Sequence, residues 1–326
     1  MTNCKISLRT VGKRSKYPDY LDSEFVGLFG SLRVNPTLSL TRAAFKRESV
    51  RYTTGLSISG VQQKLSITIN DKHQLEPVTT GGTYILKPSP EEFPYAAENE
   101  HTAMRTSALL GIPTADCGLV QFADEELAYI TRRFDRLDDG QKLHQEDLVQ
   151  GFGMPSDDKY KRSYEEAGQL ILDMTNGRKA AVLDYLQRII HAYLIGHDDM
   201  HLKNTSLQRS AGNTSPFYDY LAPNYDCLFA NTFANRDPIG LLALDLFRDG
   251  FTDAYEEYGF YTGHDFLELA KRLGVPEKPV RTFIASIEKK IPDLSKTIAD
   301  SYMPNDMKDA ASALLTDRLR ALKIGL

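Results

Sequence analysis

The arrangement of apolar residues changes near residue 137, and this change constrains the fold more than any other feature. Before it, short segments alternate apolar and polar residues, as at Leu65, Ile67 and Ile69, which is typical of strands. After it, apolar residues recur at helical spacing, and Ser163 with Glu166 forms a capping box before one such run. The pattern predicts an α+β protein with a small β-rich lobe at residues 1–137 and a larger, mostly helical lobe at 138–326.

The first lobe is expected to follow the order β-β-β-α-β-β. Its helix should run from Pro94, which suits a first helical turn, to Leu110, because Gly111 and Pro113 then stop it. Strands are expected twice within 55–70, around a loop, and at 83–87 and 127–136. Helices of the second lobe are expected after Ser163, at 178–195, and around 264–273, 276–290 and 304–323.

Composition indicates an ordinary globular protein. The chain has 326 residues, of which 41% are hydrophobic and 25% charged. Its three cysteines, Cys4, Cys117 and Cys227, are too widely spaced for a CxxC metal pair and too few for an even disulfide set, which favours a reducing compartment. There is no signal-peptide pattern, and no apolar run approaches the ~18–20 residues that span a bilayer. We expect a cytoplasmic protein that does not enter a membrane.

Charge is distributed unevenly along the chain. Residues 1–64 hold eleven Lys and Arg against four acids, a balance of +7, so the remainder carries −12 of the net −5. A basic amino-terminal segment suggests an anion at that end, such as a phosphate ligand, an acidic partner or nucleic acid. A solvated face with a loose terminus accounts for it equally well.

Most of the reactive side chains follow the helix predicted at 178–195. Within eight residues the sequence places two histidines, two acids, a lysine and an amide: His197, Asp198, Asp199, His201, Lys203 and Asn204. Such a set suits a site better than a core. Asp226 lies further on, in an apolar, strand-like segment where an unpaired carboxylate would be costly to bury.

Phosphoryl transfer accounts for these residues together. It requires an acid to accept the proton of the attacking hydroxyl, and hard oxygen ligands to hold Mg²⁺ against the phosphates. Asp199 and Asn204 have the base-x₄-Asn spacing of a protein-kinase catalytic loop, and Asp226 stands where the metal-binding acid is expected. Lys203 or His201 could neutralise the migrating phosphoryl group.

The first lobe offers the complementary groups. Lys87 lies on a predicted strand, placed like a lysine that pairs with nucleotide phosphates, and Glu98 or Glu100 on the next helix could hold its ammonium. The loop at 55–64 could cover phosphates with backbone N–H groups. It is not a Walker A motif, because Val61 stands where the lysine should be.

Other interpretations remain open. Asp226 could be a satisfied turn acid, Lys87 a solvated edge lysine, and Ser57 and Ser59 exposed strand serines. A metal-dependent phosphohydrolase is also possible, with His197, Asp198, Asp199 and His201, and His191 from the preceding helix, around a transition metal. A non-catalytic regulator that binds a partner through its basic end is a third possibility.

At these residues the sequence resembles the HipA-like serine/threonine kinase toxins of bacterial toxin–antitoxin modules. Seven blocks occur in the family's order: SISGVQQKLSI at 57–67, ILKPSP at 85–90, AENEH at 97–101, RRFDR at 132–136, HQEDL at 144–148, IGHDDMHLKN at 195–204 and LAPNYDCL at 221–228. The resemblance covers the chain from about residue 50 onward. It implies a two-lobed protein-kinase-like fold, ATP and Mg²⁺ as cofactors, and autophosphorylation.

The position of the predicted phosphate loop refines the resemblance. HipA itself has an additional amino-terminal subdomain, whereas this loop begins by Ser57, and the pair Ser57 and Ser59 is similar to the loop of HipT from three-component HipB–HipS–HipT modules. This implies a small HipS-like antitoxin and a DNA-binding HipB-like protein as partners. The implied substrate is a hydroxyl on an aminoacyl-tRNA synthetase, expected to be the tryptophanyl enzyme. Direct binding to nucleic acid is not expected.

The resemblance also implies roles for individual residues. Asp199 corresponds to the catalytic base, Asn204 and Asp226 to the Mg²⁺ ligands, Lys87 to a phosphate contact, and Ser57 and Ser59 to autophosphorylation positions. The nucleotide would be lined by Ser59, Gly60, Val61, Gln62, Gln63, Lys64, His201, Leu202, Lys203, Asn204, Tyr225, Asp226, Cys227 and Leu228, with backbone groups of Arg132, Arg133 and Phe134 as the adenine hinge. Arg132 departs from the family, where glutamate is common, which puts any side-chain contact there in doubt.

Overall fold

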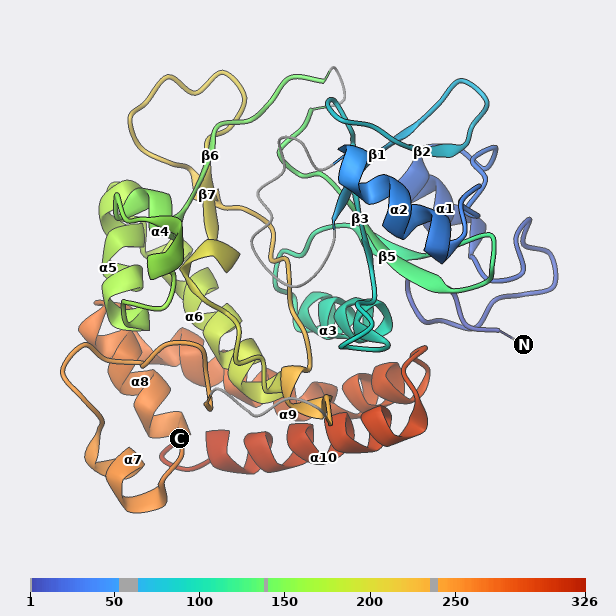
Figure 1. The fold of residues 1–326 in the computed structure, drawn as a ribbon. Coiled ribbons are helices and arrows are strands. Elements are labelled where there is room, and N and C mark those ends of the chain that lie inside the picture. The colour runs from blue at the N-terminus through green and yellow to red at the C-terminus, as the bar shows by residue number, and fades with distance from the viewer. Residues whose placement is uncertain (1, 53–63, 138–139, 235–239) are drawn as a thin grey trace.

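The computed structural model describes residues 2–52, 64–137, 140–234 and 240–326. A sheet with its own small helices lies beside a larger helical body, and α3 (Ala96–Leu109) lies between them (Figure 1). The α+β prediction with a β-rich part followed by a helical part is confirmed. No helix in the described ranges is long and apolar enough to cross a membrane.

The first sheet is five-stranded and antiparallel, in the order β2-β1-β3-β5-β4. Its strands are β1 (Leu65–Ile69), β2 (Leu75–Pro77), β3 (Tyr84–Pro88), β4 (Cys117–Gln121) and β5 (Leu127–Arg132). β3 lies at the centre, and its register places Lys87 opposite Tyr129. Since side chains alternate across a strand, Lys87 faces the helical body while its neighbour Leu86 enters the core of the first lobe.

The predicted element order of the first lobe was wrong at its start. Two helices, α1 (Asp22–Phe29) and α2 (Arg42–Tyr52), precede the sheet. They contribute Phe25, Phe29 and Phe45 to a compact core over β1, β3 and the ends of β4 and β5. These helices have weak apolar periodicity, so their helical state depends on contacts with the sheet rather than on local pattern. The first of the two strands predicted within 55–70 lies outside the described residues.

The basic amino-terminal segment does not form one continuous charged face. Lys5 is buried and pairs with Asp19 at 3.1 Å, Arg9 pairs with Glu24, and Lys46 pairs with Glu91 at 2.7 Å. Asp19 and Glu24 are already counted in the +7 balance, so of these three pairs only that of Lys46 with Glu91 offsets part of the excess, and the buried Lys5 does not belong to a solvated face.

The helical body forms largely as predicted. Its helices are α4 (Leu148–Gly151), α5 (Tyr164–Met174), α6 (Lys179–Ile195), α7 (Asp253–Tyr258), α8 (Gly263–Arg272), α9 (Glu277–Ala299) and α10 (Asn305–Leu322), and a small sheet joins β6 (Gln145–Asp147), β7 (Ser206–Gln208) and β8 (Tyr220–Leu221). The Ser163–Glu166 capping box is present at α5. α9 continues through Pro292 beyond its expected end, because Leu294 and Ile298 are buried on the far side of the proline.

Candidate active site

A cleft of about 730 Å³ lies between the first sheet and the helical body. Twelve of the predicted site residues line it: Lys64, Lys87, Arg132, Arg133, Phe134, Asp199, His201, Lys203, Asn204, Tyr225, Asp226 and Leu228. Leu202 and Cys227 are buried behind it, at 1% and 4% exposure, so their side chains do not line the cleft. Ser57, Ser59, Gly60, Val61, Gln62 and Gln63 lie outside the described residues.

The end of α6 sets the position of the loop that carries Asp199. α6 stops at Gly196, whose φ of +62° is left-handed, and a Cβ there would lie 2.5 Å from Leu314 Cδ2. The chain then turns into the cleft, where the Asp199 carbonyl accepts hydrogen bonds from His201 N and Asn204 Nδ2, both at 2.8 Å. Asn204 is thus fixed relative to Asp199.

The Asp199 carboxylate has a partner that the sequence did not suggest. Tyr160 donates its phenolic hydrogen to Asp199 Oδ1 at 2.5 Å, and its ring contacts His201 edge-on at 5.2 Å between centroids. Burial lowers the pKa of His201 to about 4, despite the opposing effect of Asp199. His201 is therefore neutral at pH 7 and does not supply positive charge to a migrating phosphoryl group.

Lys87 bridges two carboxylates at the centre of the cleft. Its Nζ lies 2.6 Å from Glu100 Oε1 and 2.6 Å from Asp226 Oδ1. Glu100, not Glu98, is therefore its partner on α3. The two carboxylates raise the pKa of Lys87 against the effect of burial, and Lys87, together with Lys64, holds the pKa of Asp226 well below its usual range.

Asp226 lies in irregular backbone, so the prediction of a strand-like segment there was wrong. Its φ is +62°, a conformation that aspartate tolerates better than most residues. Within residues 224–228, Asn224 alone pairs as in a strand, in an isolated bridge to Thr114. The turn brings the carboxylate to Lys87, and Lys64 Nζ lies 3.9 Å from its other oxygen. Carboxylate and amide oxygens in one cleft fit Mg²⁺.

The histidine-rich alternative loses its support. Within the described ranges, no three His, Cys, Asp or Glu side chains are grouped to hold a metal ion. His191 instead contacts Thr106 Oγ1 on α3 at 3.0 Å, so it belongs to the packing between helices.

Residues 132–134 close the other end of the cleft. The N–H groups of Arg132 and Arg133 already donate to Asp116 and Thr83 carbonyls at 2.8 Å. Phe134 lies against Tyr225, with 5.4 Å between ring centroids. A planar ring bound here would meet these aromatic faces, and Phe134 N–H is the backbone donor of the three that has no acceptor within the described chain.

Glu98, near the site on α3, allows the effect of burial on the pKa of a carboxyl group to be measured. It lies in the first turn of α3 with Ser89 Oγ at 3.4 Å, and burial raises its pKa to about 7. The folded chain holds this proton more tightly than the unfolded chain does. The free energy of unfolding therefore falls as pH rises from about 4.5 towards 7, where Glu98 ionises in the unfolded chain but not yet in the folded one. Glu98→Gln should therefore gain about 2 kcal/mol of unfolding free energy relative to the parent on going from pH 5 to pH 8. Urea unfolding at both values measures it.

The matched control is Glu257→Gln, at an exposed position. It should show no such pH-dependent difference. An equal difference for both variants would mean that Glu98 is not protonated in the folded chain at pH 5 to 7.

Comparison with known proteins supports this description. A family model of the HipA-like C-terminal domain matches residues 56–294. A Haemophilus influenzae protein named "Putative kinase" is 32% identical over 99% of this chain and 98% of its own length. A Sinorhizobium fredii protein of the same description, Y4dM, is 34% identical over 51% of this chain, which spans only 44% of that protein.

Two solved structures share the fold. A chain in the Shewanella oneidensis toxin–antitoxin complex of HipA, HipB and operator DNA has a TM-score of 0.64 at 21% identity, over 82% of this chain and 65% of that one. The Helicobacter pylori proinflammatory kinase CtkA has a TM-score of 0.51 at 14% identity, over 73% of this chain and 87% of that one. With the family model matching well over half of its residues, this chain belongs to the HipA-like family.

Proposed function

We propose that this chain is an ATP-dependent serine/threonine protein kinase and the toxin of a toxin–antitoxin system. The observation that carries the proposal is the bridge from Lys87 to Glu100 and Asp226, at 2.6 Å on each side, opposite Asp199 and Asn204 in one cleft. A lysine held by a helix glutamate and facing a metal-binding acid is the arrangement that phosphoryl transfer uses.

Each residue has a defined task in this proposal. Asp199 orients the acceptor hydroxyl and takes its proton. Lys87 contacts the nucleotide phosphates and Glu100 holds its ammonium, while Asn204 and Asp226 would hold Mg²⁺, which neutralises charge on the phosphates. Phe134 and Tyr225 would contact the adenine.

Incubation with γ-labelled ATP and Mg²⁺ tests the proposal. A kinase transfers the label to itself or to a protein. Release of all the label as free phosphate would instead indicate a hydrolase, and the absence of either reaction would indicate a regulator.

The substrate and partners extend this proposal. The HipA-like membership and the HipT-like pair Ser57 and Ser59 suggest phosphorylation of an aminoacyl-tRNA synthetase, specifically the tryptophanyl enzyme, which would inhibit translation. A HipS-like antitoxin and a HipB-like protein would restrain it, as HipB accompanies HipA in the Shewanella complex. Growth arrest on expression, suppressed by an excess of the synthetase, would identify the target.

Phosphorylation of Ser57 and Ser59 should inhibit the enzyme. A phosphoserine adds roughly −1.5 to −2 charge, which would repel the triphosphate and attract basic groups such as Lys64. We therefore expect Ser57→Asp combined with Ser59→Asp to lower ATP turnover. The double Asn variant is the matched control, and equal turnover in the Asp variant and the parent would contradict this regulation.

A further inference from the structure

A second hollow, about 430 Å³, adjoins the candidate active site; we call it the lateral groove. Its lining comes from residues 160–163 and 166 before and within α5, from 240–245, 247 and 248, and from Tyr255 and Tyr261. Among the residues that the structure describes, Tyr160 alone lines both the lateral groove and the 730 Å³ cleft. Since it borders both spaces, we call its side chain the partition.

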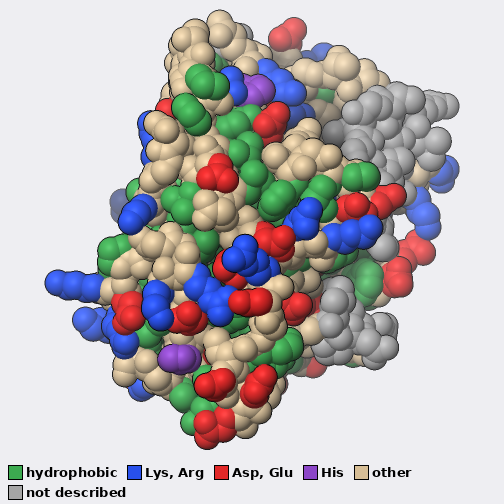
Figure 2. Space-filling view, turned by 90° about the vertical axis from the view of Figure 1, so that its left-hand side faces the viewer, with side chains coloured by type: hydrophobic (Ala, Val, Ile, Leu, Met, Phe, Trp, Pro, Cys, Tyr) green, Lys and Arg blue, Asp and Glu red, His purple; other side chains and the backbone are tan. Residues whose placement is uncertain are grey.

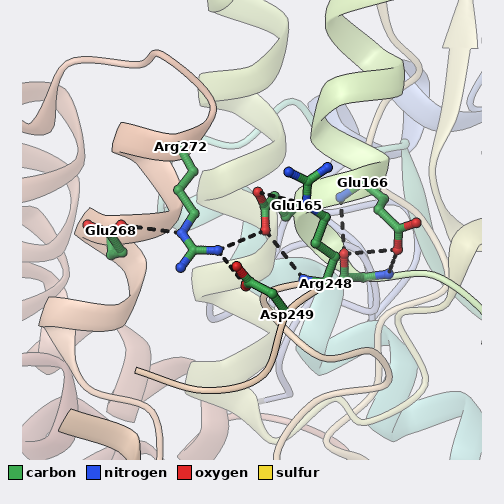
Figure 3. A network of polar contacts seen from close by, with 7 residues as sticks. Glu165, Glu166, Arg248, Asp249, Glu268 and Arg272 are labelled. Carbon is green, nitrogen blue, oxygen red and sulfur yellow. Dashed lines mark hydrogen bonds and ion pairs between the residues drawn. The ribbon is translucent and has the colours of Figure 1, made fainter. Parts of the chain in front are cut away.

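The far wall of the lateral groove is held firmly to the helical body. Tyr164 N donates to the Asp245 carbonyl and Glu165 N to the Leu246 carbonyl, both at 2.9 Å. Arg272 forms ion pairs with both Asp249 and Glu165, with N–O distances of 2.6 and 3.3 Å. Figure 3 shows these side chains converging from α8, the 245–250 segment and α5. A ligand would thus meet a preformed groove. Figure 2 shows acidic and basic side chains interspersed on the left-hand side of Figure 1, where α5 and α8 lie.

Tyr160 is hydrogen-bonded to the proposed catalytic base. Tyr160 is 40% exposed, and its O–H donates to Asp199 Oδ1 at 2.5 Å, a short hydrogen bond to a carboxylate. In phosphoryl transfer, that carboxylate must accept a hydrogen bond from the acceptor hydroxyl. The phenol therefore competes with an acceptor hydroxyl for Oδ1, one of the two oxygens of this carboxylate.

A serine or threonine hydroxyl lies much closer to its own backbone than a phenol does. To place its hydroxyl at Asp199, an acceptor segment must therefore bring its backbone closer to Asp199 than the backbone of Tyr160 is. That space is filled by the Tyr160 ring. We propose that the lateral groove binds an extended polypeptide segment of the protein substrate, and that this segment displaces Tyr160 from Asp199 to deliver its hydroxyl. This inference rests on the proposed kinase function and adds to it the route of the acceptor.

Tyr160→Phe tests the displacement, because it keeps the ring and removes the competing donor. A hydrogen bond to an ionised group shifts a population by about tenfold or more, so phosphate release from ATP, with water as acceptor, should rise about tenfold. Tyr220→Phe is the matched control, since Tyr220 is also 40% exposed and lines neither space. Its rate should equal that of the parent.

Other results would overturn the displacement. A fall in the rate of Tyr160→Phe would mean that the phenol supports Asp199 instead of competing for it, and an unchanged rate would mean that the contact has no effect. Phosphate found on Tyr160 of the parent by mass spectrometry would make it a substrate. If neither the parent nor Tyr160→Phe turns over ATP above the Asp199→Ala rate, the proposed kinase function itself fails.

The route is tested by blocking the lateral groove. Cys4, Cys117 and Cys227 are buried, so Lys161→Cys, at a position 68% exposed on the groove rim, offers one accessible thiol for a maleimide carrying a polyethylene glycol chain. The probe is a library of peptides, each with one serine or threonine. Labelling should lower the ratio of peptide phosphorylation to phosphate release about tenfold or more, since misplacing an acceptor by an ångström can cost about a hundredfold.

The unlabelled variant is the control. An unchanged ratio after labelling would overturn the route. Phosphate release without phosphorylation of any peptide would also overturn it, because the acceptor would then not enter as an extended segment.

Discussion

Replacing Asp199 by alanine is expected to lower phosphoryl transfer by about a thousandfold or more, with the fold retained. The variant loses the group that accepts the hydroxyl proton, and general-base catalysis contributes roughly 10²- to 10⁴-fold. The Asp199 side chain is half-buried and accepts a hydrogen bond from the phenol of Tyr160, a residue that is itself exposed, so its loss should cost little stability. Transfer of label from γ-labelled ATP measures the effect.

Two further measurements make this result specific. ATP affinity should be nearly unchanged, because Lys87, Asn204 and Asp226 all remain. Asp317→Ala, at an exposed acid on α10 that forms a surface ion pair with Arg320, should behave as the parent. Persistent labelling by Asp199→Ala would remove Asp199 from its proposed task.

Local sequence spacing predicted what depends on local structure. The Ser163 capping box, the helix that ends at Ile195 and the polar loop after it all follow from residues within one or two turns of each other. The strand that carries Lys87 was also predicted, because TYILK is short, apolar and followed by proline. Twelve of the site residues predicted from the sequence line one cleft in the structure.

The remaining features depend on contacts distant in sequence. Glu98 and Glu100 lie on the same helix, and which of them reaches Lys87 depends on the rotation of α3 against β3, which no local pattern gives. The turn at Asp226 forms because Lys87, 139 residues earlier, and the neighbouring packing hold it. Tyr160 comes from a loop 39 residues before Asp199, without a motif to mark it.

Replacing Lys87 by methionine should abolish most activity and also destabilise the fold. The side chain is 6% exposed and Glu100 is completely buried, so the variant leaves two carboxylates without their shared cation. Breaking a buried ion pair from one side typically costs about 3–5 kcal/mol. Loss of a phosphate-contacting charge should lower the rate by about a hundredfold or more. Urea unfolding and label transfer measure the two effects separately.

A second substitution can separate stability from catalysis. Adding Glu100→Leu to Lys87→Met replaces the buried pair with apolar groups, an exchange that is often neutral or stabilising. Asp226 would keep Lys64, at 3.9 Å, as a partner. We therefore expect the double variant to recover most of the lost unfolding free energy while label transfer stays as low as in Lys87→Met. Recovery of activity together with stability would show that Lys87 acts only in folding, and that the phosphates are held by other groups.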